Sequence, residues 1–171
     1  MLMDLRQRGL LVDGFRLEDI GGFTAARGEV VDGTLLISPL NGTEHQLVAA
    51  RLAVVLAEEA PAELTVLLSP VVARRGATDR LLVPDVAVVR TSALTGGPLW
   101  VAPDDVWLAA EIASPPSRAV DLHLKRALYA DWGVEAYWVL DPDSREVHRF
   151  GPHPIEGSWL AEVDLDVWPD A

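Results

Sequence analysis

Short apolar runs bounded by turn residues mark the first regular part of this chain, and they predict a β-hairpin. Residues 29–31 and 34–37 are mostly apolar, and Asp32-Gly33 separates them. Asp-Gly between two apolar runs is the strongest short-range hairpin signal, because both residues tolerate the positive φ of the turn. The preceding region is irregular, apart from a short helical stretch expected over residues 17–23.

The next segment changes from a strand-like to a helical period. Apolar residues recur there at the spacing of one helix face, which predicts a helix from Thr43 to about Glu59. Thr43 and Gln46 match a capping box at its start, and Pro61 ends it. The recurring apolar residues are Leu47, Val48, Leu52, Val55 and Leu56.

Four apolar runs then predict strands over residues 64–68, 71–74, 81–90 and 106–113. A second helix is expected over residues 118–132. Ser117 is its predicted N-cap and Gly133 its C-terminal stop.

A second hairpin follows, with strands at residues 136–140 and 146–150 on either side of a turn that contains Pro142. In the tail after Gly151 we expect at most one further edge strand.

The order of these elements is hairpin, helix, four strands, helix and hairpin. This order predicts an α/β fold of the α+β kind, in which two main helices flank a central mixed β-sheet. The 171 residues contain no repeat and no long linker. They therefore predict a single domain over residues 1–171, with its core at about residues 15–150.

Composition narrows the class of protein. Half of the residues are apolar and the mean hydropathy is +0.20, which indicates a packed globule rather than a disordered chain. No apolar run approaches the roughly 20 residues of a membrane span, and no signal peptide is recognised. The absence of cysteine excludes disulfides and thiolate chemistry. We therefore expect a cytoplasmic protein without a membrane partner.

Acidic residues interrupt two of the apolar strands and are the first candidates for chemistry. Asp85 follows Pro84, and Glu111 lies within residues 106–113. A charge within a buried strand is costly unless it is paired or bound to a metal. Two carboxylates on adjacent strands, with the Ile112 carbonyl, would form a partial Mg²⁺ site. The alternative is that Asp85 only begins a strand after a proline turn and that Glu111 pairs with an arginine.

Lys125 is the only lysine among the 14 basic residues. Asp121, Lys125 and Tyr129 are four residues apart, so they share one face of the predicted helix. This helix follows the Glu111 strand directly, which would bring Lys125 over the carboxylates. The alternatives are that Lys125 is a solvated helix residue, or that it forms a surface pair of small energy with Asp121.

The Pro84-Asp85 and Glu111 pattern resembles that of the PD-(D/E)xK nuclease superfamily, whose members share the restriction endonuclease-like fold. A finer resemblance, over about residues 15–150, is to the Uma-two type family of restriction endonuclease-like proteins. The matching segments are residues 28–33, 44–46, 111–117 and 125–142. The resemblance implies a nuclease that uses Mg²⁺ or Mn²⁺ to hydrolyse DNA phosphodiester bonds, and it implies a homodimer.

Residue by residue, the resemblance implies that Asp85 and Glu111 are metal ligands, that Glu29 is an accessory acid and that Lys125 is the catalytic lysine. The chain departs from the superfamily pattern at Ala113, which occupies the usual lysine position two residues after the glutamate. Lys125 on the following helix must then supply the cation. His45 is expected to have a structural role or to contact a metal-binding residue, rather than to be a metal ligand itself.

Net charge argues against this function. The value of −12 disfavours broad contact with nucleic acid, although metal ions can supply positive charge at a site. Two alternatives therefore stay open. One is a catalytically inactive nuclease-fold interaction module, which the charge and Ala113 favour, and the other is a hydrolase of a smaller phosphoester.

Overall fold

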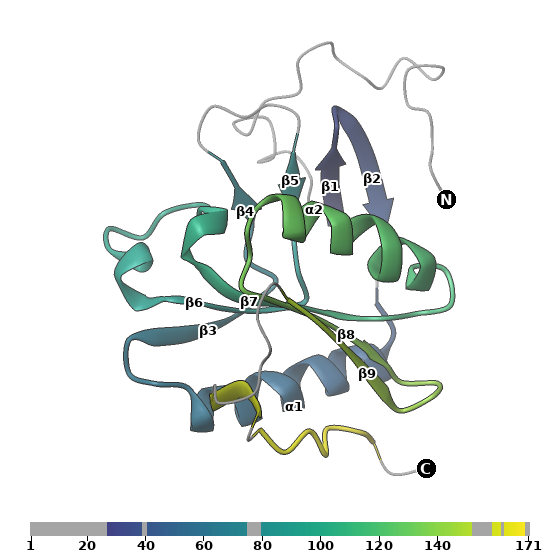
Figure 1. Cartoon of the computed structure of the whole chain (residues 1–171). Helices are drawn as coiled ribbons and strands as arrows, with labels where there is room; N and C mark the ends of the chain where they lie inside the picture. The colour runs from purple at the N-terminus through teal and green to yellow at the C-terminus, as the bar shows by residue number, and fades with distance from the viewer. Residues whose placement is uncertain (1–26, 39–40, 75–79, 152–158, 162, 170–171) are drawn as a thin grey trace.

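A five-stranded mixed sheet runs through the middle of the molecule, with one helix on each side (Figure 1). The computed structural model describes residues 27–38, 41–74, 80–151, 159–161 and 163–169. The strand order is β3-β6-β7-β8-β9, in which β7 and β8 are parallel and the other pairs antiparallel. The strands are β3 (Leu64–Leu68), β6 (Val86–Arg90), β7 (Val106–Ile112), β8 (Ala136–Asp141) and β9 (Glu146–Phe150).

A smaller antiparallel sheet, in the order β2-β1-β5-β4, lies at one side of the first. The predicted hairpin forms its outer half, and the turn residues Asp32 and Gly33 have φ values of 47° and 75°, as an Asp-Gly hairpin turn requires. The sequence predicts one sheet, so the second is a finding of the structure. Its strands are β1 (Arg27–Val31), β2 (Thr34–Ser38), β4 (Val72–Ala73) and β5 (Leu81–Leu82).

The single strand predicted over residues 81–90 is wrong, because the chain changes sheets within it. β5 ends at Leu82 in the small sheet and β6 begins at Val86 in the large one. Pro84 has no N–H to donate to a strand ladder, so pairing stops at this point. As a consequence, Asp85 lies where the two sheets meet.

Helix α1 (Thr43–Glu59) has the predicted bounds and covers one face of the large sheet. Its buried residues Val48, Leu52 and Leu56 join the core formed with that face. The predicted capping box is wrong: the N-cap is Gly42, which has no capping side chain. Because the helix begins at Thr43 itself, the Gln46 side chain instead donates to the Asn41 carbonyl oxygen at 3.2 Å.

The second helical segment runs from residue 118 to residue 131 and covers the opposite face. Its middle is a π-helix (Val120–Lys125), followed by α2 (Arg126–Asp131). Leu128 and Tyr129 pack into the core on this face. The sequence predicts the helix but not the π-helical part, a feature that is frequent at functional sites.

The remaining regular elements are short 3₁₀-helices at Thr91–Leu94, Pro103–Asp105 and Trp159–Ala161. The edge strand expected in the tail is absent from the part of the tail that the structure describes. Residues such as Leu160 and Val167 pack into the core beside α1 instead. The helical stretch expected over residues 17–23 lies outside the described residues. No helix within the described ranges is long and apolar enough to cross a membrane.

Candidate active site

The two acids that interrupt apolar strands lie side by side. Along β7, Leu108, Ala110 and Ile112 face the α1 core, so Glu111 points to the opposite face, under the second helix. Asp85 comes immediately before Val86, which pairs with Ala110. The Ile112 N–H donates to Oδ2 of Asp85 at 2.8 Å. The expectation that adjacent strands aim both acids at one place therefore agrees with the geometry.

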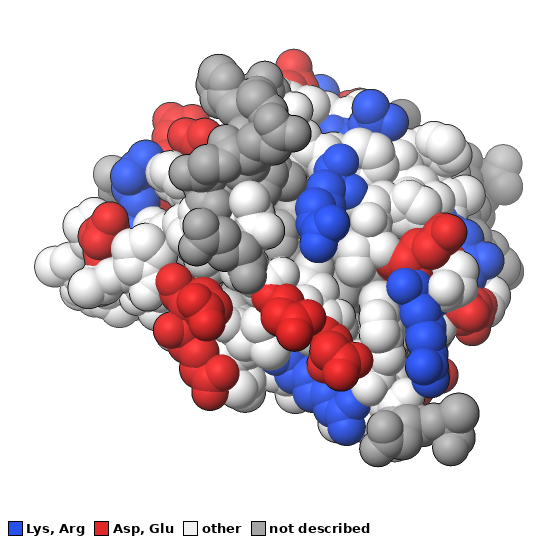
Figure 2. All heavy atoms as spheres, turned by 60° about the horizontal axis from the view of Figure 1, so that its bottom comes forward, with Lys and Arg blue, Asp and Glu red and all other residues white. Residues whose placement is uncertain are grey.

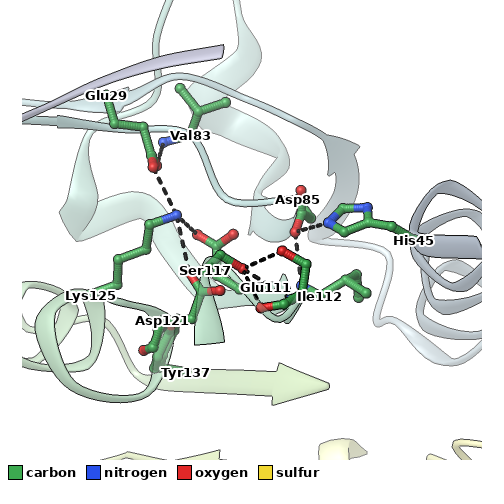
Figure 3. Close-up of polar contacts among 11 residues, drawn as sticks. Glu29, His45, Val83, Asp85, Glu111, Ile112, Ser117, Asp121, Lys125 and Tyr137 are labelled. Atoms are coloured by element: carbon green, nitrogen blue, oxygen red, sulfur yellow. Dashed lines mark hydrogen bonds and ion pairs between the residues drawn. The ribbon is translucent and has the colours of Figure 1, made fainter. Parts of the chain in front are cut away.

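Lys125 reaches this place from the π-helix. Its Nζ lies 2.9 Å from Oε1 of Glu111 and 2.8 Å from Oε2 of Glu29 (Figure 3). The residue is only 5 % exposed, so the interpretation of Lys125 as a solvated helix residue is wrong. Glu111 pairs with this lysine, as its position beneath the helix requires. Ala113 is buried among apolar residues, and the cation comes from the helix instead.

Glu29 is the one site acid that comes from the small sheet, where it lies on β1. One carboxylate oxygen, Oε2, contacts Lys125, and the other, Oε1, accepts the Val83 N–H at 2.8 Å. Val83 lies in the link between β5 and β6. Glu29 therefore connects the small sheet to the segment between β5 and β6, which carries Asp85. It also connects this sheet to the helix that carries Lys125.

Asp121 is also a buried member of the site. The sequence indicated only that it could pair with Lys125. Its Oδ1 is 3.5 Å from Nζ of Lys125, and the residue is 2 % exposed. The surface-pair alternative is therefore wrong. Burial raises the pKa of Asp121 above its ordinary value of 3.8, although Lys125 and the Ser117 hydroxyl act in the opposite direction. The four-residue spacing to Lys125 was the only signal in the sequence.

These side chains line a pocket of about 90 Å³. Its wall combines residues of both sheets, of α1 and of the second helix. The acidic members are Glu29, Asp85, Glu111 and Asp121, and Lys125 is the only lysine or arginine among the lining residues. Negative charge is thus in excess in a buried place, which raises the free energy of the site unless protons or a further cation offset it.

The carboxylates fit one of the two ways in which proteins hold a divalent cation. Mg²⁺ commonly takes one or two protein carboxylates and completes its shell with water and substrate phosphate. Asp85 and Glu111 both line the pocket and match this mode. The described part of the chain contains no group of three or more His, Asp or Glu side chains placed to hold a metal. An all-protein cage therefore does not fit.

Tyr137 on β8 lies beneath the site and yields a prediction about pH. Its hydroxyl donates to the Asp121 carbonyl oxygen at 2.9 Å. Burial raises the Tyr137 pKa well above its ordinary value of 10.0, and the nearby acids, Glu111 first, raise it further. Above pH 10 the unfolded chain loses this proton before the folded protein does, so the free energy of unfolding falls as the pH rises.

We expect Tyr137→Phe to weaken this dependence. Between pH 9 and pH 11, urea unfolding of the wild type should show a slope steeper than that of Tyr137→Phe by up to about 1.4 kcal/mol per pH unit. Equal slopes in the two proteins would contradict the assignment of a buried, protonated Tyr137.

Comparison with known proteins shows which family and which fold this chain resembles. The sequence from residue 16 to residue 167 matches the model of the Uma2 family, which is described as "Putative restriction endonuclease". The fold is similar to a crystal structure described as a putative nuclease belonging to DUF820 from Anabaena variabilis. The TM-score is 0.62 with 20 % identity, and the match covers 84 % of this chain and 89 % of that chain. No curated protein sequence matches.

Proposed function

The chain belongs to the Uma2 restriction endonuclease family, and from this premise we propose that it is a metal-dependent endonuclease that hydrolyses DNA phosphodiester bonds. The proposed centre consists of Asp85, Glu111, Lys125 and Glu29. The proposed cofactor is Mg²⁺ or Mn²⁺.

One observation supports this proposal above the others: three carboxylates, those of Glu29, Glu111 and Asp121, surround Lys125 in a buried pocket that Asp85 also lines. Glu29, Asp85, Glu111 and Asp121 are each 4 % exposed or less. A protein that needed only stability would gain as much or more from apolar side chains of similar volume at these positions. A divalent cation held by two of the carboxylates, Asp85 and Glu111, would offset the excess negative charge. The pKa of Asp121, which burial in this pocket raises, also favours a functional site.

Each residue has a distinct part in the proposed reaction. Asp85 and Glu111 would hold the ion, which when bound supplies Lewis acidity toward the phosphate oxygens and lowers the pKa of water. The Lys125 ammonium would stabilise negative charge that develops on the phosphate. Glu29 and Asp121 would fix the direction of the Lys125 side chain, because both contact its Nζ.

The charge of the surface bears on the substrate. The net charge is −12, and on the face shown in Figure 2 arginine side chains alternate with acids instead of forming one basic stripe. The proposed DNA complex would therefore rely on local contacts and on the ion, and it would be weak at high salt. The homodimer implied by the family resemblance stays part of this proposal. The same charge favours a second candidate, an inactive interaction module with the same fold.

Calorimetric titration with Mn²⁺, of the wild type beside Asp85→Asn, tests the proposal. We expect saturable binding to the wild type and none to Asp85→Asn, because the substitution removes the charge of one proposed ligand while keeping an oxygen acceptor for the Ile112 N–H. Plasmid and oligonucleotide DNA should be cleaved by the wild type only. Absence of binding and of cleavage in both proteins would instead support the interaction module.

A further inference from the structure

His45 lies at the edge of the candidate site and has no part in the reaction described above. It is the third residue of α1, and it shares a helix face with Val48, Leu52 and Leu56, which are buried against the large sheet. The packing of that face fixes the direction of the first turn. The imidazole therefore projects from a rigid element toward the pocket, which it helps to line.

The imidazole contacts one particular oxygen of Asp85. Nε2 of His45 lies 3.1 Å from Oδ2 of Asp85, and the two side chains are 11 % and 5 % exposed (Figure 3). The same oxygen accepts the Ile112 N–H at 2.8 Å. An ionised carboxylate only accepts hydrogen bonds, so Nε2 of His45 carries a proton in this contact. A nitrogen engaged in this way is not available as a metal ligand.

Two donors from different elements thus converge on Oδ2 of Asp85. The Ile112 N–H approaches from β7 and His45 approaches from α1. A single hydrogen bond would leave the carboxylate free to rotate about its Cβ–Cγ bond, whereas two fixed donors on one oxygen define its plane. His45 therefore restricts the orientation of an acid that the proposed function uses to hold a cation.

We propose that His45 is a positioning residue that presents the Asp85 carboxylate to a divalent cation. This inference rests on the proposed function, since it requires a cation at Asp85. Partners that orient a ligating carboxylate contribute about 10- to 100-fold to metal affinity. His45 accordingly sets the affinity of the site without contacting the ion.

A purely structural role for His45 makes a different prediction. Loss of a largely buried contact at the start of α1 would lower the free energy of unfolding, but the affinity of the folded protein for Mn²⁺ would not change. The two roles are separated by substitutions that keep or remove the hydrogen bond at similar volume. His45→Gln keeps an amide donor near the Nε2 position, whereas His45→Leu fills the space without a donor.

The experiment is calorimetric titration of the apo protein with Mn²⁺, together with urea unfolding of each variant. We expect His45→Leu to bind Mn²⁺ about 10- to 100-fold more weakly than the wild type, and His45→Gln to bind close to the wild-type affinity. His45→Ala, as a second variant without a donor, should behave like His45→Leu. His148→Ala, which changes a histidine on β9 outside the pocket, is the matched control.

Wild-type affinity in folded His45→Leu or His45→Ala would overturn the inference while leaving the proposed function intact. An equal loss of affinity in His45→Gln and His45→Leu would also overturn it, because the donor would then be irrelevant. Absence of Mn²⁺ binding in the wild type would overturn the proposed function itself, and this inference with it.

Discussion

Replacing Glu111 by glutamine is expected to lower the rate of Mn²⁺-dependent DNA cleavage by about 10³-fold, because a carboxylate that holds the ion contributes several kcal/mol to transition-state stabilisation. The fold should survive this change. Glutamine has the same volume, and its Oε1 can still accept the hydrogen bond that Lys125 Nζ makes at 2.9 Å. Single-turnover cleavage of a labelled oligonucleotide, beside a urea unfolding curve, separates the loss of chemistry from a loss of folded protein.

The matched control for Glu111→Gln is Glu58→Gln, which makes the same chemical change on the exposed side of α1. Its cleavage rate should equal that of the wild type. Glu111→Gln retaining more than about a tenth of the wild-type rate would remove Glu111 from the proposed metal site, since this corresponds to less than 1.4 kcal/mol of transition-state stabilisation.

Local patterns predicted the elements that depend on neighbouring residues. The hairpin around Asp32-Gly33 and the bounds of α1 follow from turn chemistry and from apolar spacing, and both are confirmed. The α+β fold with two helices around a mixed sheet is confirmed as well, as is the family. These features are set by the spacing of apolar residues and by a few turn residues, both of which are visible in the sequence.

Features that depend on distant residues were not predicted. The run over residues 81–90 is apolar on both sides of Pro84-Asp85, and its division between two sheets becomes visible only when β5 pairs with β1. The buried contact of Glu29 Oε1 with the Val83 N–H joins residues 54 positions apart. Sequence periodicity carries no information about such pairings, so the second sheet was missed.

The candidate site shows the same difference between local patterns, which were predicted, and contacts between distant residues, which were not. The spacing between Asp121 and Lys125 placed both on one helix face, but a surface pair and a buried cluster have identical spacing. Burial distinguishes a surface pair from a buried cluster, and it depends on how β1 and β7 pack against the helix. The contact between His45 and Asp85 could not be predicted either, because it requires the first turn of α1 to lie beside the start of β6.

Lys125→Met is expected to destabilise the folded protein by about 3–5 kcal/mol at pH 7, the usual cost of removing one partner from a buried ion pair. Methionine has a similar length and apolar stem, so little packing is lost. What remains is a buried group of carboxylates, including Glu29 and Glu111, without the ammonium that now lies within 2.9 Å of both. Urea unfolding at constant temperature measures the difference.

The pH dependence of this loss identifies its cause. Lys125 lowers the pKa of Asp121, which burial raises above 3.8, so removing Lys125 raises that pKa further. Above pH 4 the unfolded chain has lost this proton while the folded variant keeps it up to the raised pKa, so the free energy of unfolding falls as the pH rises through this range. The loss caused by Lys125→Met should therefore be smaller at pH 5 than at pH 7. Adding Asp121→Asn to Lys125→Met should recover part of the stability at pH 7.

Arg126→Met is the matched control, because it removes a cation at the next position, where the guanidinium is exposed and stacks on Phe150 at 4.2 Å. Its effect should stay within about 1 kcal/mol and should not depend on pH, as is usual for an exposed cation–π contact. A similarly small, pH-independent effect of Lys125→Met would mean that water or protons already compensate the carboxylates. The excess buried charge would then no longer argue for a bound divalent cation, and the interaction module would become the better account of this fold.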